Sequence, residues 1–221
     1  MKYIVFDTET TGLPERKSYD VYYPYTQLEK YKFSRLVSIA WAVYDGGEKI
    51  ISRYFIIKPE GFAINNSSKA TEIHGITKEI AEEQGVDIHM VFLALLGDID
   101  VELLQTLVAH NLEFDWNILL SEISRISRGN NKDNLNEECR VAGVLMKLVL
   151  SLKKHCTMKM GASVVKIPHR YSRSGWKYPS MQELHEHLFG ARFTNAHNAE
   201  ADMVACNACY QRLIGITTGT K

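Results

Sequence analysis

The stretch KYIVFDTETTGLP, residues 2–14, decides the expected fold. It opens on β-branched, aromatic and apolar residues with no capping residue ahead of them, which predicts a short strand buried on both faces. Two carboxylates, Asp7 and Glu9, come next, and Gly12 and Pro14 then break the strand. Because residues i and i+2 of a strand point to the same face, Asp7 and Glu9 are expected to lie side by side.

A pair of like charges at the end of a buried strand is costly in free energy, and a divalent cation between them would remove that cost. Ligands that are all oxygen suit Mg²⁺ or Mn²⁺ far better than Zn²⁺. The alternative is that Asp7 and Thr8 only begin a turn, as Asp and Thr often do after a strand. Further acidic residues that could lie near Asp7 and Glu9 in the fold would favour the metal site over the turn.

The composition is that of an ordinary globular protein, with 221 residues, 45% of them hydrophobic, and 26 basic against 26 acidic side chains. The length fits one large α/β domain or two small ones. No apolar run is long enough to span a membrane, and no signal peptide precedes the first strand, so we expect no membrane partner and no secretion. The zero net charge gives no global attraction to nucleic acid, so such a partner requires a local patch.

The four cysteines are too sparse for a disulfide-stapled secreted domain, so we expect reduced thiols in a cytoplasmic or nuclear protein. They are Cys139, Cys156, Cys206 and Cys209. The pair Cys206-x-x-Cys209 invites a zinc or redox interpretation, but no second pair has matching spacing. We expect both to behave as small apolar residues of one helix face.

The hydrophobic pattern predicts one α/β domain over residues 1–215, followed by a C-terminal tail at 216–221. Its sheet is expected to be mixed and five-stranded, an antiparallel meander extended by parallel strands, with helices on both faces. After the first strand, further strands are predicted at 36–44, 49–57 and 106–110. Helices are predicted at about 86–96, from Asn111 to about 126, and at 137–152, 180–188 and 199–213.

Two connections in this scheme are long. Residues 14–35 form a polar, tyrosine-rich connection, and connections of that length are usually functional or disordered. Residues 128–136 form a polar break between two helices.

Asp115 is the third acidic candidate. It lies in the first turns of a helix, beside the apolar stripe that Leu112, Trp116 and Leu119 begin. A carboxylate there is stabilised by the helix N-terminus. The alternative is an ordinary solvated aspartate of a first helical turn.

Asp202 is the fourth candidate and the more informative one. It falls on the same helix face as Cys206 and Leu213, so it should point inward, where an aspartate needs a cation or several hydrogen-bond donors. Asn198 is a good N-cap for this helix. His197 therefore lies on the preceding loop, free to approach the same site, although a single histidine is more often structural.

With these four carboxylates and this histidine in this order, the sequence resembles the DEDDh 3′–5′ exonuclease family, the proofreading epsilon-subunit type within the ribonuclease H-like superfamily. The matching motifs extend from residue 2 to about 213. They are residues 7–13, 110–115 and 197–202, with smaller elements at 73–77, 156–158 and 184–190. The sequence departs from the family in a lengthened, basic segment between Ser127 and Pro179, which bears on substrate preference rather than on chemistry.

The resemblance implies a site with two divalent ions, Mg²⁺ or Mn²⁺. Asp7, Glu9 and Asp202 would hold one ion, and Asp7 with Asp115, partly through water, would hold the second. His197 would deprotonate the attacking water, and its unperturbed pKa of about 6.5 suits a general base near neutrality.

The resemblance also implies contacts to the terminal nucleotide. Thr10 and Leu13 would lie against that nucleotide, and His74 and Asn111 would border its pocket.

A basic segment, residues 147–177, contains eight Lys or Arg and no Asp or Glu, with aromatic residues in and beside it. Basic side chains bind phosphates, and aromatic rings stack on unpaired bases. We therefore expect Arg170, Arg173 and Lys177 to contact nucleic acid. The alternative is a solvated lysine-rich surface offset by acidic regions elsewhere.

The expected function is metal-dependent release of nucleoside 5′-monophosphates from single-stranded or frayed 3′ ends, first of all of DNA. Two alternatives stay open: an exoribonuclease with the same site, and a catalytically silent module that binds nucleic-acid ends or a polymerase. The resemblance suggests a DNA polymerase, or another replication or repair protein, as a protein partner.

Overall fold

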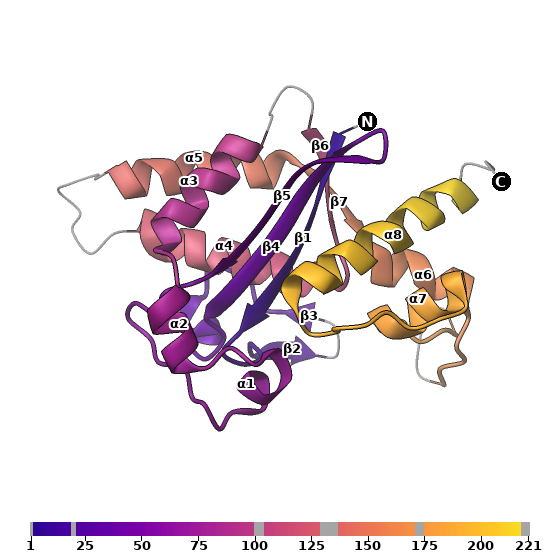
Figure 1. The fold of residues 1–221 in the computed structure, drawn as a ribbon, viewed down its shortest axis with the longest axis horizontal. Helices are drawn as coiled ribbons and strands as arrows, with labels where there is room; N and C mark the ends of the chain where they lie inside the picture. The colour runs from indigo at the N-terminus through magenta and orange to yellow at the C-terminus, as the bar shows by residue number, and fades with distance from the viewer. Residues whose placement is uncertain (1, 19–20, 100–103, 129–136, 171–174, 218–221) are drawn as a thin grey trace.

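The computed structural model describes residues 2–18, 21–99, 104–128, 137–170 and 175–217. Its main sheet has five strands in the order β5-β4-β1-β6-β7, with β1 in the centre (Figure 1). β1 pairs antiparallel with β4 and parallel with β6, and β6 pairs parallel with β7. The predicted mixed sheet is thereby confirmed. The strands are β1 (Lys2–Thr10), β4 (Leu36–Asp45), β5 (Glu48–Ile56), β6 (Leu104–Ala109) and β7 (Lys153–Cys156).

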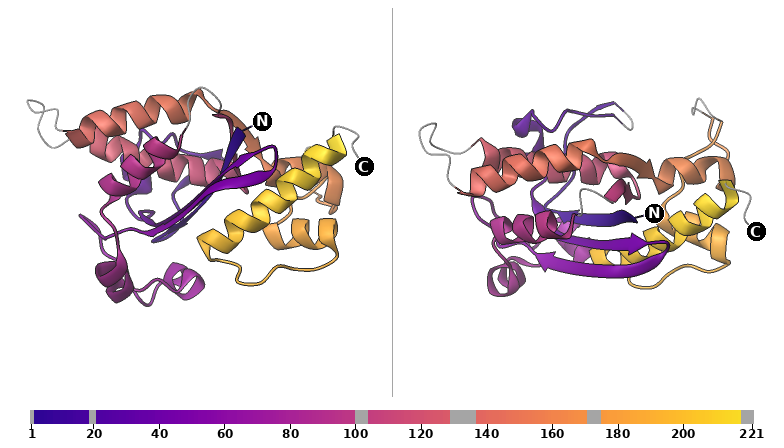
Figure 2. Two further views of the ribbon diagram at one scale, coloured as in Figure 1. Left: turned by 45° about the horizontal axis from the view of Figure 1, so that its top comes forward. Right: turned by 90° about the horizontal axis from the view of Figure 1, so that it is seen from above.

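Helices cover both faces of the sheet, and the alternation of side chains along β1 shows which core lies on which face. Ile4 and Phe6 belong to the larger core, which contains α3 (Ile88–Asp98), α4 (Leu112–Ser127) and α5 (Glu137–Ser151). Tyr3 and Val5 belong to a second core with α8 (Ala199–Thr217). Figure 2 shows α8 and the α4–α5 pair on opposite sides of the sheet.

Shorter helices flank the sheet, and side-chain caps explain where several of them begin. Thr77 accepts a hydrogen bond from the Ile80 amide at the start of α2, and Ser180 forms a capping box with Glu183 at the start of α7. Gly190 ends α7 in the left-handed conformation. These helices are α1 (Lys69–His74), α2 (Lys78–Gln84), α6 (Thr157–Val165) and α7 (Met181–Phe189).

The structure differs from the sequence prediction in two connections. The 14–35 connection contains a small hairpin, β2 (Arg16–Ser18) with β3 (Val21–Tyr22), and a 3-10 turn, η1 (Leu28–Tyr31). The basic segment supplies the fifth strand, β7, at the edge of the sheet, where lysines are tolerated because one side of the strand needs no partner.

Two helix boundaries also differ from prediction. α3 begins at Ile88, because the Asp87 side chain caps it by accepting a hydrogen bond from the His89 amide. α8 continues to Thr217, beyond the predicted end at residue 213. The boundary between a domain at 1–215 and a tail at 216–221 stays a prediction.

Among the helices of the described ranges, none is both long and apolar enough to cross a membrane. All four cysteines are buried free thiols, as expected.

Candidate active site

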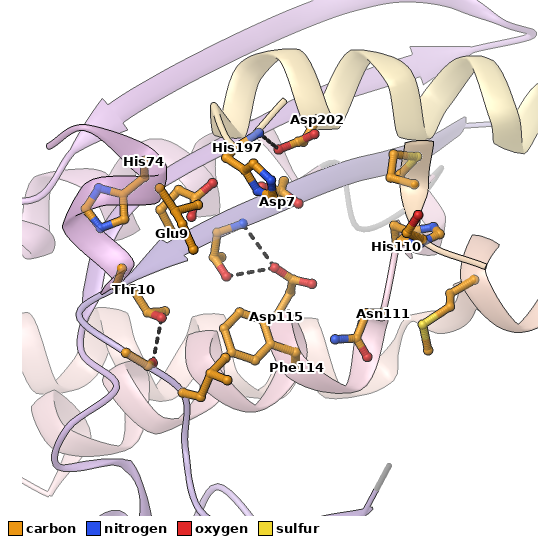
Figure 3. Close-up of a pocket in the computed structure, with 18 of the residues that line it drawn as sticks. Asp7, Glu9, Thr10, His74, His110, Asn111, Phe114, Asp115, His197 and Asp202 are labelled. Atoms are coloured by element: carbon orange, nitrogen blue, oxygen red, sulfur yellow. Dashed lines mark hydrogen bonds between the residues drawn. The ribbon is translucent and has the colours of Figure 1, made fainter. Parts of the chain in front are cut away.

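Three carboxylates meet where β1 ends beneath the start of α8. Asp7 and Glu9 lie two residues apart on β1 and share the face that α8 covers, and Asp202 projects from the first turn of α8 (Figure 3). Each offers an oxygen atom, and these oxygens lie within 4.8 Å of one another. The side-by-side arrangement expected for Asp7 and Glu9 is what the structure shows.

Asp115 reaches the same place from the other side of the sheet. Pairing of β1 with β6 stops at Val5, and α4 begins soon afterward at Leu112. The backbone of Asn111 adopts the left-handed conformation, with φ of 59°, and reverses the chain between β6 and α4. The first turn of α4 therefore lies beside the end of β1, on the edge where pairing with β6 has stopped and only β4 remains as a partner.

Thr8 holds Asp115 in this position. Its backbone amide and its hydroxyl both donate hydrogen bonds to Asp115 Oδ1, at 3.0 and 2.7 Å. Asp115 is only 2% exposed and Thr8 only 5%, so the solvated alternative for Asp115 is wrong. Thr8 was not a candidate in the sequence, because its hydrogen bond joins residues 107 positions apart.

Burial and mutual repulsion make ionisation of these carboxyl groups costly. Burial, followed by the charges of Asp115, Asp202 and Glu9, raises the pKa of Asp7 well above its ordinary range. Burial and neighbouring carboxylates raise the pKa of Glu9 to about 8. Burial also raises the pKa of Asp115 to about 7, opposed by the hydrogen bonds from Thr8.

His197 lies on the loop before α8, as expected, and its side chain lines the site (Figure 3). Its backbone amide donates a hydrogen bond of 2.8 Å to Asp202 Oδ2. Asn198 accepts hydrogen bonds from the amides of Glu200 and Ala201, which confirms it as the N-cap. The backbones of Asn195 and His197 both adopt the left-handed conformation, with φ of 58° and 68°.

The carboxylates line a pocket of about 670 Å³. Five of the seven predicted substrate-binding residues also line it: Thr10, Leu13, His74, Asn111 and Lys177. Apolar side chains, including Ile73, Phe114 and Met158, complete its walls.

The described part of the basic segment contributes Met158 and Lys177 to the lining of this pocket. Arg170 is exposed and is not among the described residues that line it, and Arg173 lies outside the described residues. Within the segment, Lys159 lies 3.7 Å from Glu113, and Lys177 forms an ion pair with Glu183 at 2.7 Å. Nucleic-acid contacts of Arg170 and Arg173 stay predictions.

His110 is a pocket residue to which the sequence analysis assigned no role. Its Nε2 lies 3.1 Å from the Pro179 carbonyl oxygen, so Nε2 carries the proton and donates, while Nδ1 accepts from the Thr157 hydroxyl at 3.0 Å. Burial lowers the pKa of His110 to about 4, so the ring is neutral. His110 therefore ties the end of β6 to the segment that carries Lys177 into the pocket.

The other candidate metal ligands have structural surroundings. Cys206 and Cys209 are buried at 1% and 0% exposure among apolar side chains.

The four carboxylates fit a site for divalent cations. They supply only hard oxygen donors, which suit Mg²⁺ or Mn²⁺. Burial and mutual repulsion raise the pKa values of these carboxyl groups and so oppose their ionisation, and a bound cation would offset that cost. Oδ2 of Asp115 receives neither of the Thr8 hydrogen bonds, since both go to Oδ1.

The fold is similar to solved structures of exonuclease I. A product-bound exonuclease I matches with a TM-score of 0.62 and 15% identity, over 97% of this chain and 43% of that chain. The zinc-bound complex of Escherichia coli exonuclease I with single-stranded DNA matches with a TM-score of 0.61 and 16% identity, over 99% and 41%. A moderately thermophilic exonuclease I from Methylocaldum szegediense matches with a TM-score of 0.61 and 17% identity, over 99% and 41%.

This chain thus spans about two fifths of the length of these structures. No curated protein sequence matches it significantly. The family model described as Exonuclease (RNase_T) matches residues 4–210, which is nearly the whole chain. The chain therefore belongs to the RNase_T exonuclease family.

Proposed function

We propose that this protein is a metal-dependent 3′–5′ exonuclease that releases nucleoside 5′-monophosphates, with single-stranded DNA as its first substrate. The observation that carries this proposal is the convergence of four carboxylates, from β1, α4 and α8, on one pocket of about 670 Å³. A catalytically silent binding module has no physical need to bring four acids together at this cost in free energy.

Asp7, Glu9 and Asp202 would hold one divalent ion, and Asp7 with Asp115 would hold a second. Two such ions, when bound, stabilise the attacking and leaving oxygens of a phosphodiester. Thr8 orients Asp115, because it fixes Oδ1 with two hydrogen bonds. We propose Mg²⁺ or Mn²⁺ from the all-oxygen donor set.

His197 is proposed as the general base that accepts the proton of the attacking water. Its side chain lines the pocket and is exposed, so water reaches it freely. The hydrogen bond from its backbone amide to Asp202 fixes the loop next to the metal-binding carboxylates. A neutral imidazole has one ring nitrogen with a free lone pair, which can accept the proton of a water molecule.

The terminal nucleoside would occupy the apolar part of the pocket. Leu13 and Ile73 offer apolar contacts to a base and a sugar, and Thr10, His74 and Asn111 border the same space. Leu13 is 71% exposed and lines the pocket, so a bound nucleoside would cover its side chain.

The choice of DNA rests on similarity. The E. coli exonuclease I structures include complexes with single-stranded DNA and with a dA16 oligonucleotide, and this chain has their fold. An exoribonuclease with the same site is the second candidate. A polymerase partner and a cytoplasmic or nuclear location stay predictions from the sequence.

The test uses 5′-labelled single-stranded DNA and RNA oligonucleotides with Mg²⁺, Mn²⁺ or a chelator. Asp7→Asn removes one shared ligand, and Glu200→Gln is the matched control, since Glu200 lies exposed in the same α8 turn as Asp202. We expect a metal-dependent ladder shortening from the 3′ end with the wild type and Glu200→Gln, absent in Asp7→Asn. Intact oligonucleotides under all conditions would refute the proposal, and faster RNA cleavage would favour the exoribonuclease.

A further inference from the structure

The β2–β3 hairpin places a cation and an aromatic ring beside the pocket. Arg16 and Tyr22 are cross-strand partners, so their side chains share one face of the hairpin. The Arg16 guanidinium carbon lies 4.9 Å from the centre of the Tyr22 ring, and Arg16 also lines the pocket. The hairpin is therefore continuous with the pocket wall rather than a remote loop.

Phe114 extends this wall into the pocket. Its ring centre lies 6.2 Å from that of Tyr22, with an angle of 57° between the ring planes, and Phe114 itself lines the pocket next to Asp115. A path of side chains thus leads from the carboxylates through Phe114 to Tyr22 and Arg16 (Figure 3 shows Phe114 and Asp115 at its inner end).

The other face of the hairpin has its own cation and ring. Lys17 follows Arg16 on β2 and so points to the opposite face, where its ammonium group lies 5.5 Å from the centre of the Tyr23 ring. Lys30 approaches the same ring, at 4.9 Å. Among the described residues of the two strands, Arg16 lines the pocket, whereas Lys17, on the opposite face, does not.

A cation beside aromatic rings at the edge of a phosphodiesterase site matches the chemistry of a nucleotide in a single strand. Aromatic rings stack on unpaired bases of any sequence, and arginine binds phosphate with its planar fork of donors. A base within a duplex offers no free face for such stacking.

We propose that Arg16, Tyr22 and Phe114 form a subsite for the nucleotide that precedes the terminal one in a single strand, a role that rests on the proposed exonuclease function. Arg16 binds a phosphate on the 5′ side of the scissile bond, and the Tyr22 and Phe114 rings contact the adjoining base. The subsite favours single-stranded substrates of more than one nucleotide over substrates with a single nucleoside.

The experiment compares a single-stranded DNA oligonucleotide with the p-nitrophenyl ester of thymidine 5′-monophosphate, which carries one nucleoside. Selectivity is the ratio of kcat/KM for the oligonucleotide to kcat/KM for the ester. Arg16→Ala and Tyr22→Ala should each lower this ratio about tenfold, mainly through KM for the oligonucleotide. Arg16→Ala should also reduce the slope of log KM against log salt concentration by about 0.7, as expected for one lost phosphate contact.

Two variants serve as controls. Lys17→Ala removes the same charge from the next residue, on the face away from the pocket, and should leave the ratio unchanged. Tyr22→Phe keeps the ring and should retain the wild-type ratio, which separates stacking from a role of the hydroxyl. Thermal melting of each variant, in the same buffer, checks that it is folded.

An unchanged ratio in Arg16→Ala, or an equal loss in Lys17→Ala, would overturn the subsite. A wild type that cleaves the ester and the oligonucleotide, with variants that do not alter the ratio, would leave the exonuclease proposal intact. A wild type that cleaves neither substrate would refute both proposals.

Discussion

The hydrogen bonds between Thr8 and Asp115 allow a sharp prediction. Thr8→Val keeps the shape of the side chain and the backbone amide donor, and removes only the hydroxyl that donates to Asp115 Oδ1 at 2.7 Å. A hydrogen bond to a charged group contributes about 1.5–3 kcal/mol. Since Asp115 is buried and no solvent can replace the lost donor, the variant should disfavour the ionised carboxylate by that amount.

This loss has two measurable consequences. The pKa of Asp115, already raised to about 7, should rise further, by about one to two units at 1.36 kcal/mol per unit. At neutral pH the variant should bind Mn²⁺ about 10- to 100-fold more weakly, measured by calorimetry. The acidic limb of the pH–rate profile should move to higher pH by the same one to two units.

Ser121→Ala is the matched control. Ser121 is also buried on α4, but its hydroxyl donates to the Ile118 carbonyl oxygen and does not contact the site. This variant should keep the metal affinity and pH profile of the wild type. Wild-type Mn²⁺ affinity and an unshifted acidic limb in Thr8→Val would refute the idea that Thr8 prepares Asp115 for the ion.

Three further predictions concern stability. In the presence of chelator, the free energy of unfolding should fall by at most about 5 kcal/mol as pH rises from 4.5 to about 8. The reason is that the folded state binds the Glu9 proton more tightly than the unfolded chain does. A denaturant midpoint that stays constant over this pH range would contradict the prediction. Mn²⁺ should raise the Tm of the wild type at pH 8, and Asp7→Asn should abolish this shift while raising the Tm of the metal-free protein; an Mn²⁺ shift that persists in the variant would count against the assignment. Gly161→Ala should lower the free energy of unfolding by about 1–3 kcal/mol in urea titrations, because its Cβ would lie 2.7 Å from Leu184 Cδ1; an unaltered urea midpoint would show that the leucine moves away freely.

The parts of the site that the sequence could predict are those with a local periodic signal. Asp7 and Glu9 lie side by side because strand alternation requires it, and Asp202 faces β1 because helical spacing places it above Cys206. Asn198 was recognisable as a cap from its position alone. Each of these inferences needed only neighbouring residues.

Contacts between distant segments left no such signal. In the sequence, Thr8 is indistinguishable from an ordinary strand residue. Its role follows from the tertiary structure, because pairing of β1 with β6 stops at Val5 and Asp115 then lies next to Thr8. β7 was missed because an edge strand of sequence Lys-Lys-His-Cys lacks the apolar alternation of a half-buried strand. The β2–β3 hairpin was missed because strands of two and three residues are too short for any period to be detected.

The position of the carboxylates also explains why this end of the sheet can support a metal site. Asp7 and Glu9 point toward the α8 layer, whereas Thr8, between them, points toward the α4 layer and binds Asp115. The end of β1 therefore lies next to Asp202 from the α8 layer and Asp115 from the α4 layer, where β1 continues past its pairing with β6. Because ions held there would bridge α4, β1 and α8, metal binding should stabilise the packing of both layers on the sheet, and not only the pocket. Hydrogen exchange with and without Mn²⁺ tests this: protection should increase in the first turns of both α4 and α8, and protection confined to α8 would show that Asp115 does not share in holding the ions.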